Sequence, residues 1–491
     1  MKHLLILGFA LIYGQVCAGQ IQQNPLLPAT WNIKSEELLG YVTELAGDKY
    51  QGRLTGSEGY RKSAEWVAGK LSEWGILPAS SENSWYQEFR QSYVTVFPDC
   101  LLTLNVPVNE KDTINISYHY FDEFMPGSSS GSGTVRAEVV FAGYGISAPE
   151  LGYDDYSGIN VQGKIVLMRP EAPVSPDAGA GKFTPWQPYS THQYKMLNAI
   201  KHGAAGVLYH YGPLANTNND FHEGFLVTMV GNRVVEDLFK GTKKNYSDVV
   251  NQIYADVKPQ SFSTGKTVTI RNLTGFHPEG VGMNVVGLIP GTDPVLKNEV
   301  IIIGGHLDHC GMDWDICPGA NDNASGIAVM LGVAKALASS GFHFKRSILF
   351  IGLGAEEQGL VGSKTYIADP LFPVKKTLGF INLDCVGVGP NLHAGGGQNY
   401  PGLYKAIDQA NASFVHRNLV ASFSTNLGRP RSDASIFMQA GIPSLSFSSS
   451  GGSGAYHTPD DKPSTIWPET LQDLATILTL AMADLAVLSE K

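Results

Sequence analysis

Histidine and acidic residues follow several apolar runs in the C-terminal part of this chain. They are His306 and Asp308 after EVIIIGG, Glu356 and Glu357 after RSILFIGLGA, and Asp384 after LGFINL. Another histidine, His457, follows Tyr456 after a serine- and glycine-rich loop. Asp322 stands at the start of a predicted apolar helix. Mixed imidazole and carboxylate ligands with open positions are typical of catalytic zinc, whereas structural zinc prefers closed, cysteine-rich sites. These residue types therefore predict a catalytic metal centre.

The number of candidate ligands bears on how many ions they hold. Five of these residues, two histidines and three carboxylates, are candidates for direct ligands; they are too few for two separate zinc sites, but they suffice if one carboxylate bridges both ions. Paired ions can clamp the attacking and departing atoms and acidify a shared water. A neighbouring unliganded carboxylate can then carry the proton, and the adjacent Glu356 and Glu357 suit this division of labour. Taken singly, each residue has an ordinary structural explanation; their shared position favours the metal centre.

The elements that would bring these residues together are an alternation of strands and helices after Gly282. NVVGLIPG, EVIIIGGHLD, RSILFIGLGAEE, LGFINLDCVG and IPSLSFSSS are apolar runs of strand length, and most are separated by helical segments such as 325–340. This alternation predicts an α/β fold with a mainly parallel or mixed sheet flanked by helices. Sites in such sheets lie at the carboxyl ends of the strands, where the candidate residues are found.

Two further regions precede this sheet. Residues 31–76 have helical spacing, with two helices joined by the turn QGRLTGSEG, in which Arg53 is expected to be structural. Between about Val96 and Arg271, short strands and turns dominate, which predicts an inserted β-rich domain. Asp154 and Asp155 in this insert are expected to cap a turn rather than to bind a metal.

The N-terminus and the overall charge bound the location and the partners. Residues 1–18 have a short basic start, an apolar core and small residues before Ala18, which predicts a signal peptide cleaved after Ala18 and a secreted or periplasmic protein. No other stretch is expected to span a membrane. A net charge of -10 argues against nucleic-acid binding, which needs clustered Lys and Arg.

Four cysteines remain once the signal is removed: Cys100, Cys310, Cys317 and Cys385. Export permits disulfides. Cys310 and Cys317 bracket a short loop beside the predicted metal strand. The sequence is equally compatible with a disulfide between them and with two free thiols. Cysteine ligation of zinc is less favoured, because histidines and carboxylates already fill a site.

Several motifs give the chain a family resemblance. GGHLDH, PGANDNASG, GAEEQGLVGS, INLDCVG and AYHTPDD occur in the order found in peptidase family M28, the zinc aminopeptidases of the aminopeptidase Y type. FAGYGISAP, YDDYSGINVQGKIVLMRP and KMLNAIKHGAAGVLY resemble the protease-associated (PA) domain. The resemblance implies a zinc exopeptidase fold, of the phosphorylase/hydrolase-like type, with these parts: signal peptide 1–18, N-terminal part of the peptidase domain 19–110, PA insert 111–272, and zinc peptidase domain 273–491.

The resemblance also implies a role for each candidate residue and two Zn²⁺ ions as cofactors. His306 and Asp384 would bind one zinc, Glu357 and His457 the other, and Asp322 would bridge both. Glu356 would be the general base and acid, Asp308 would orient the His306 imidazole, and Tyr456 would donate to the oxyanion. His309, His393, Asp313 and Asp315 match no family position and are expected to be loop residues.

The leading hypothesis is a secreted dizinc aminopeptidase that acts on peptides with a free N-terminus through a metal-bridging water. A glutaminyl cyclase shares the fold but uses one zinc and does not normally carry a PA insert. A glutamate carboxypeptidase joins the same two domains but has a long helical domain after the last histidine, where this chain has only 458–491. A receptor-like binding protein of the same architecture would have lost some of the residues needed for catalysis. All six of these residues are present here: His306, Asp322, Glu356, Glu357, Asp384 and His457.

Overall fold

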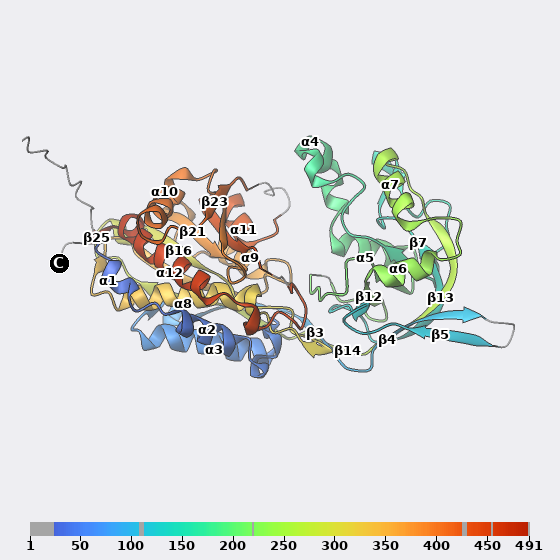
Figure 1. Cartoon of the computed structure of the whole chain (residues 1–491), viewed down its shortest axis with the longest axis horizontal. Coiled ribbons are helices and arrows are strands. Elements are labelled where there is room, and N and C mark those ends of the chain that lie inside the picture. Colours follow the sequence, from blue (N-terminus) through green and yellow to red (C-terminus); the bar gives the residue numbers. More distant parts are fainter. Residues whose placement is uncertain (1–23, 108–111, 219, 425–429, 453–454, 490–491) are drawn as a thin grey trace, which may run out of the picture.

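The computed structural model describes residues 24–489 except 108–111, 219, 425–429 and 453–454, and the predicted signal peptide lies outside these residues. Figure 1 shows two bodies, each built on its own sheet, joined through the small sheet that contains β3 (Tyr93–Val96) and β14 (Thr274–His277). The larger body holds the N-terminal helices and the chain after β14. The smaller body is formed by the segment between β3 and β14.

The larger body is built on a nine-stranded mixed sheet. Its strand order is β1 (Leu77–Pro78), β15 (Val281–Ile289), β20 (Ser347–Leu353), β16 (Val300–His306), β21 (Thr377–Leu383), β24 (Ser444–Ser450), β22 (Asn391–Gly395) and β23 (Leu419–Ser422), and β2 (Tyr86–Arg90) also pairs with β15. The four central strands β20, β16, β21 and β24 are parallel. The predicted α/β class and the five predicted strands are confirmed.

Helices cover both faces of this sheet. Side chains of β16 alternate between two clusters: Ile301 and Ile303 pack in one, Val300 and Ile302 in the other. The first cluster includes side chains of α2 (Ser35–Leu45), α3 (Glu58–Glu73), α8 (Ser325–Ala338) and α12 (Pro468–Met482), and the second those of α9 (Val361–Ala368) and α11 (Asp433–Gln439). Because both faces of β16 are buried, the strand is apolar along its whole length.

The smaller body contains an eight-stranded sheet. Its strand order is β5 (Thr113–Ser117), β4 (Leu101–Pro107), β13 (Phe262–Asn272), β7 (Gly133–Phe141), β10 (Ile165–Met168), β11 (Gly206–Tyr209), β12 (Leu226–Val230) and β6 (Phe124–Pro126). Helices α5 (His192–Lys201), α6 (Asn232–Phe239) and α7 (Tyr246–Asp256) pack around it. β4 precedes residue 111, the start of the insert that the resemblance implies, and pairs with β5 and β13, so this sheet begins within the β-rich region that the composition predicts from about Val96.

One described helical stretch, 468–487, is long and apolar enough to cross a membrane by length and composition alone. Most of it is buried inside the protein, and α12 packs against α8 and α2. Its apolar surface is therefore accounted for by packing within the larger body.

Candidate metal centre and adjoining pocket

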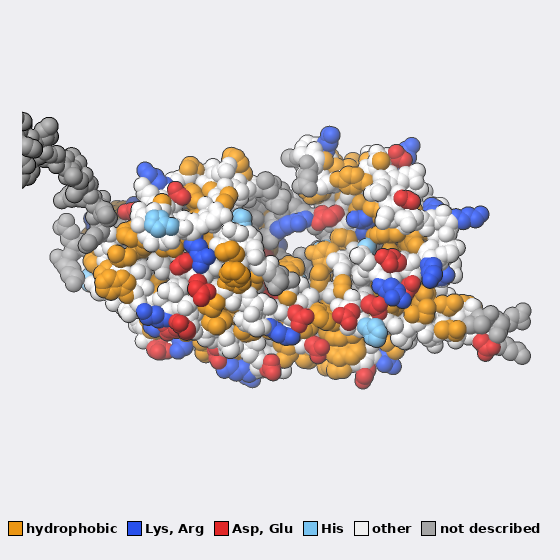
Figure 2. All heavy atoms as spheres, in the orientation of Figure 1, with side chains coloured by type: hydrophobic (Ala, Val, Ile, Leu, Met, Phe, Trp, Pro, Cys, Tyr) orange, Lys and Arg blue, Asp and Glu red, His pale blue; other side chains and the backbone are white. Residues whose placement is uncertain are grey.

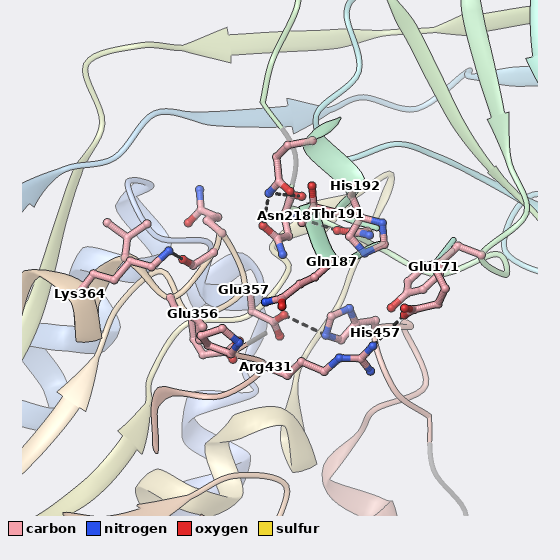
Figure 3. A pocket seen from close by; sticks show the side chains of 18 of the residues that line it. Glu171, Gln187, Thr191, His192, Asn218, Glu356, Glu357, Lys364, Arg431 and His457 are labelled. Atoms are coloured by element: carbon pink, nitrogen blue, oxygen red, sulfur yellow. Dashed lines mark hydrogen bonds and ion pairs between the residues drawn. The ribbon is translucent and has the colours of Figure 1, made fainter. Parts of the chain in front are cut away.

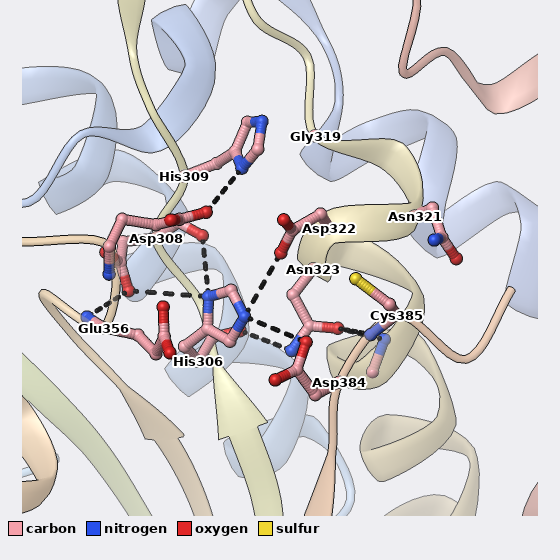
Figure 4. A network of polar contacts seen from close by, with 12 residues as sticks. His306, Asp308, His309, Gly319, Asn321, Asp322, Asn323, Glu356, Asp384 and Cys385 are labelled. Carbon is pink, nitrogen blue, oxygen red and sulfur yellow. Dashed lines mark hydrogen bonds and ion pairs between the residues drawn. The ribbon is translucent and has the colours of Figure 1, made fainter. Parts of the chain in front are cut away.

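The predicted ligands meet at the carboxyl edge of the central parallel strands. β16 ends at His306, β20 ends three residues before Glu356, and β21 ends just before Asp384. Asp322 lies in the turn 320–324 that leads into α8 (Figure 4). His457 lies in the loop after β24. The parallel register explains the convergence, because neighbouring parallel strands end at the same edge of a sheet.

Asp322 lies between the two histidines. Its Oδ1 is 3.3 Å from His306 Nε2, and its Oδ2 is 3.3 Å from His457 Nε2. Each imidazole nitrogen faces a second carboxylate as well: His306 Nε2 is 3.5 Å from Asp384 Oδ1, and His457 Nε2 is 3.0 Å from Glu357 Oε2. The five residues thus form two groups of one imidazole and two carboxylates that share Asp322.

The hydrogen bonds on the opposite side of each ring show which nitrogen carries a proton. His306 Nδ1 lies 3.2 Å from the Asp308 carbonyl oxygen and His457 Nδ1 lies 2.8 Å from that of Ala215, so both Nδ1–H groups donate to carbonyls. In the neutral rings the Nε2 lone pairs then point at carboxylate oxygens. Lone pairs that face anions need a proton or a cation between them, and the same carboxylates raise the pKa of His306 well above its ordinary value although burial lowers it. The donor set fits metal cations.

Asp308 and Glu356 lie beside these groups with separate partners. The Asp308 carboxylate accepts hydrogen bonds from the backbone N–H groups of Glu356 and Glu357, at 3.1 and 3.3 Å. This carboxylate was expected to orient the His306 imidazole, but its Oδ1 lies 3.8 Å from His306 Nδ1. The backbone carbonyl of Asp308 accepts the hydrogen bond from the ring instead. Asp308 therefore holds the two glutamates, and its backbone holds the histidine.

Burial raises the pKa of the Glu356 carboxyl well above its ordinary value, against the attraction of His306, and the charge of Glu357 raises it further. Glu356 lines a pocket. Among the described residues its carboxylate forms no ion pair with a histidine, whereas that of Glu357 pairs with His457. A carboxyl group with a raised pKa at a pocket wall is suited to take up and return a proton.

Backbone conformation at the centre is unusual. Ala355, Cys385 and His457 have φ values of 53°, 56° and 56°, in the left-handed region that non-glycine residues rarely adopt. Each either belongs to the proposed ligands or adjoins one of the site residues. Strained residues of this kind persist where the surrounding structure fixes them and cluster at functional sites.

A cavity of about 720 Å³ opens beside the centre, between the two bodies (Figures 2 and 3). Glu356, Glu357, Tyr456 and His457 line it from the larger body. Its other wall comes from the smaller body and includes Glu171, Gln187, Thr191, His192, Tyr211 and Asn218. Arg431 Nη2 of the larger body pairs with Glu171 Oε1 at 2.8 Å across this cavity. Tyr456 is half-exposed, and its ring stacks on that of His457 with centroids 3.7 Å apart.

The smaller body also contacts the metal centre directly, which the sequence did not indicate. Besides accepting from His457 Nδ1, Ala215 donates its N–H to the His457 carbonyl at 2.9 Å. Thr217 Oγ1 donates to the Glu357 carbonyl at 2.9 Å. No motif marks this segment, since backbone groups and a common threonine carry the contacts.

His309 is a second residue whose place the sequence did not reveal. It was expected to be a loop residue, but it is fully buried, and its Nδ1 is 3.0 Å from Glu357 Oε1. His309 is part of the motif GGHLDH, but no ligand role was attached to its position in that motif, so no signal distinguished it. Asp313 is buried too and accepts a hydrogen bond from Ser128 at 2.9 Å, at the junction of the two bodies.

Arg53 has the structural role expected of it. Its buried guanidinium donates to the carbonyls of Leu45, Leu307, Pro318 and Gly319 at 2.7–2.9 Å. It thereby ties the N-terminal turn to both ends of the segment between His306 and Asp322. Cys310 and Cys317 are free and buried, so the disulfide that was left open is not formed.

The fold and this donor set define an α/β protein with a candidate metal centre at the edge of its main sheet. Residues 284–482, the core of the larger body, match peptidase family M28. The match covers fewer than half of the 491 residues, so the similarity to this family applies to that region.

The relatives and a solved structure are consistent with that placement. Leupeptin-inactivating enzyme 1 of Streptomyces exfoliatus is 32% identical over 193 residues, 38% of this chain and 40% of that protein. Aminopeptidase YwaD of Bacillus subtilis is 28% identical over 315 residues, 61% of each chain. The match therefore spans less than two thirds of either relative. The structure of an aminopeptidase from Aneurinibacillus sp. strain AM-1 covers 95% of this chain and 97% of its own, with a TM-score of 0.65 and 22% identity, and shows the same fold.

Proposed function

We propose that this protein is a dizinc aminopeptidase that removes N-terminal residues from peptides. The observation that carries the proposal is the placement of Asp322 between two imidazoles, each completed by a further carboxylate. His306 and Asp384 would hold one zinc ion, Glu357 and His457 the second, and Asp322 both. The match of residues 284–482 to peptidase family M28 and the similarity to aminopeptidase YwaD support the reaction class.

Bound zinc ions would polarise the scissile carbonyl and lower the pKa of the attacking water. Glu356 takes the proton of that water and returns it to the leaving amine nitrogen, for which its raised pKa suits it. Asp308 fixes the backbone of Glu356 and Glu357, so that one glutamate faces the ions and the other the pocket. Tyr456, at the pocket wall, donates its hydroxyl hydrogen to the developing oxyanion.

The pocket favours an aminopeptidase over a carboxypeptidase. A carboxypeptidase needs a cation for the terminal carboxylate of its substrate. The two cations in the pocket wall already have partners: Arg431 pairs with Glu171, and Lys364 donates to the Gly359 carbonyl at 2.8 Å. The excess of carboxylates around Glu356 suits a substrate that carries a free ammonium group.

We further propose that the segment 111–272 is a PA domain, that it forms the outer wall of the substrate pocket, and that the protein acts outside the cytoplasm after cleavage of its signal peptide. The contacts of Ala215 and Thr217 with His457 and Glu357 support a part for this body in the active site.

A substrate panel with parallel zinc analysis tests the proposal. It contains an aminoacyl p-nitroanilide, its N-acetylated counterpart, a peptide with C-terminal glutamate, and a peptide with N-terminal glutamine. We expect the protein to hydrolyse the aminoacyl p-nitroanilide but not its N-acetylated counterpart, and to contain two zinc ions per chain. Release of C-terminal glutamate, or cyclisation of the glutamine peptide by a protein with one zinc, would replace the proposal with a carboxypeptidase or a cyclase.

A further inference from the structure

His309 and Cys310 add two donors to the second ion position that the proposed mechanism does not use. Both are fully buried, and one donor atom from each of His309, Cys310, Glu357 and His457 lies within 4.8 Å of the others. His309 Nε2 has no hydrogen-bond partner among the described residues. The group is thus a closed set of two imidazoles, a thiol and a carboxylate next to the proposed metal pair.

Glu357 connects this group with the pair. Its Oε2 is 3.0 Å from His457 Nε2, and its Oε1 is 3.0 Å from His309 Nδ1, so its two oxygens serve opposite sides. His457 can offer only Nε2, because its Nδ1–H donates to Ala215. One nitrogen lone pair binds one ion at a time, so an ion among His309, Cys310, Glu357 and His457 excludes an ion between Glu357, His457 and Asp322.

The two sets of ligands differ in the ions they prefer. Towards Asp322, the ligands are carboxylates and one imidazole. Towards Cys310, they include a sulfur and a second imidazole, and thiolates select soft ions. Coordination by Cys310 would replace the thiol proton, which passes to solvent, so each ion bound there releases one proton.

We propose that the second ion has two overlapping positions: a bridged position with Asp322, and a displaced position with His309 and Cys310 that thiophilic ions prefer. This inference rests on the proposed function, since it concerns the second of the two ions. An ion in the displaced position leaves Asp322 without its second partner and separates the pair. Cadmium would therefore bind at the centre but leave the enzyme inactive, because its second ion would lie away from Asp322.

Cadmium added to the metal-free protein tests this directly. The readouts are the ultraviolet charge-transfer band of a cadmium–thiolate bond and the cadmium bound per chain. We expect two cadmium ions and a thiolate band in the wild type, and loss of the band in Cys310→Ser. Cys317→Ser is the matched control, because Cys317 is buried in the same side-chain cluster but is not among the four donors; it should keep the band.

Two more variants complete the test. Cys385 lies near Asp322 and Asp384 at the first ion position, so Cys385→Ser should also keep the band. His309→Asn should weaken cadmium binding by about ten-fold or more while zinc binding changes less, which provides a second test should Cys310→Ser fail to fold. A band that persists in Cys310→Ser, or that disappears only in Cys385→Ser, would overturn the inference. Absence of the band with two bound cadmium ions would also overturn it while leaving the dizinc proposal intact, whereas failure to bind any metal would remove the proposed function itself.

Discussion

Asp155 in the smaller body and Asp322 in the larger body are both almost fully buried, but their surroundings differ. Asp155 accepts hydrogen bonds from the backbone N–H groups of Tyr144 and Ile146 and from the Tyr153 hydroxyl. Burial raises the pKa of Asp155 to about 7, and these hydrogen bonds and the charge of the buried Lys195 oppose that rise. Among the residues that the structure describes, no backbone N–H donates to the Asp322 carboxylate, and its two oxygens face imidazole nitrogens. The first arrangement needs no ion, and the second fits one.

The balance of buried charge repeats this difference. In the smaller body, Asp155 has Lys195 nearby. In the larger body, the buried Arg53 gives its hydrogen bonds to carbonyls, while several carboxylates meet around Asp322. Burial of acidic residues is therefore no sign of a metal centre by itself. The partners decide: hydrogen-bond donors make a structural network, and lone pairs facing carboxylates make a cation site.

The largest expected effect comes from removing the proton carrier of the larger body. Glu356→Gln should lower peptidase activity by about 10²–10⁴-fold or more while zinc content stays the same, because proton transfer is lost and no ligand is removed. Rates on an aminoacyl substrate and zinc per chain are measured together. Turnover close to that of the wild type would exclude the role assigned to Glu356.

Metal content distinguishes the two kinds of buried carboxylate. Glu357→Ala should lower bound zinc from two ions to one, since Glu357 faces His457. Asp155→Asn, the matched change in the smaller body, should leave both ions bound. If the Glu357 variant kept its full zinc content, the two adjacent glutamates would have to exchange roles.

Arg53 tests whether buried charge in the larger body is also structural. Arg53→Met leaves four buried carbonyls without a donor, so we expect a loss of about 3–5 kcal/mol in unfolding free energy. Arg53→Lys keeps the charge but not the fork of donors and should lose less. Denaturant unfolding compares the three proteins, and equal midpoints for all three would show that the guanidinium contacts add little.

A smaller effect is expected at Asp313, where the two bodies meet. Burial raises the pKa of Asp313 to about 7 in the folded protein, against about 3.9 when unfolded. Both states are protonated below about pH 4; between about pH 4 and 7 the unfolded state alone loses its proton, so stability falls as pH rises and then levels off.

Asp313→Asn keeps an acceptor for Ser128 but cannot ionise. The fall in unfolding midpoint between pH 5 and pH 8 should therefore be smaller in the variant than in the wild type. Identical pH dependence in both proteins would show that Asp313 does not retain its proton in the fold.

The sequence predicted those features that depend on local pattern. The runs around Ile301–Ile303 and Phe350 are apolar because both faces of their strands are buried, and strand ends locate His306, Glu357 and Asp384. Asp154 and Asp155 cap a turn as expected, through the N–H groups of Tyr144, Ile146 and Tyr156.

The features that it did not predict depend on contacts between distant segments. Ala215 and Thr217 reach the candidate metal centre because the smaller body docks there, and Ala215 contributes only its backbone atoms to the contact with His457. The carboxylate of Asp308 accepts hydrogen bonds from the N–H groups of Glu356 and Glu357 rather than from His306. This contact depends on the position of the loop that follows β20 relative to Asp308. The pairing of β4, which begins at Leu101, with β13 places the start of the second sheet before residue 111, the boundary that the resemblance implied.

The central claim, that Asp322 joins two zinc ions into one catalytic centre, is tested most directly by a zinc titration of the metal-free protein. The rate of hydrolysis of an aminoacyl p-nitroanilide is followed as zinc is added in known ratios to the chain. The account predicts that the rate continues to rise until two zinc ions are bound per chain. A rate that reaches its maximum at one ion per chain, or that is present before zinc is added, would contradict it.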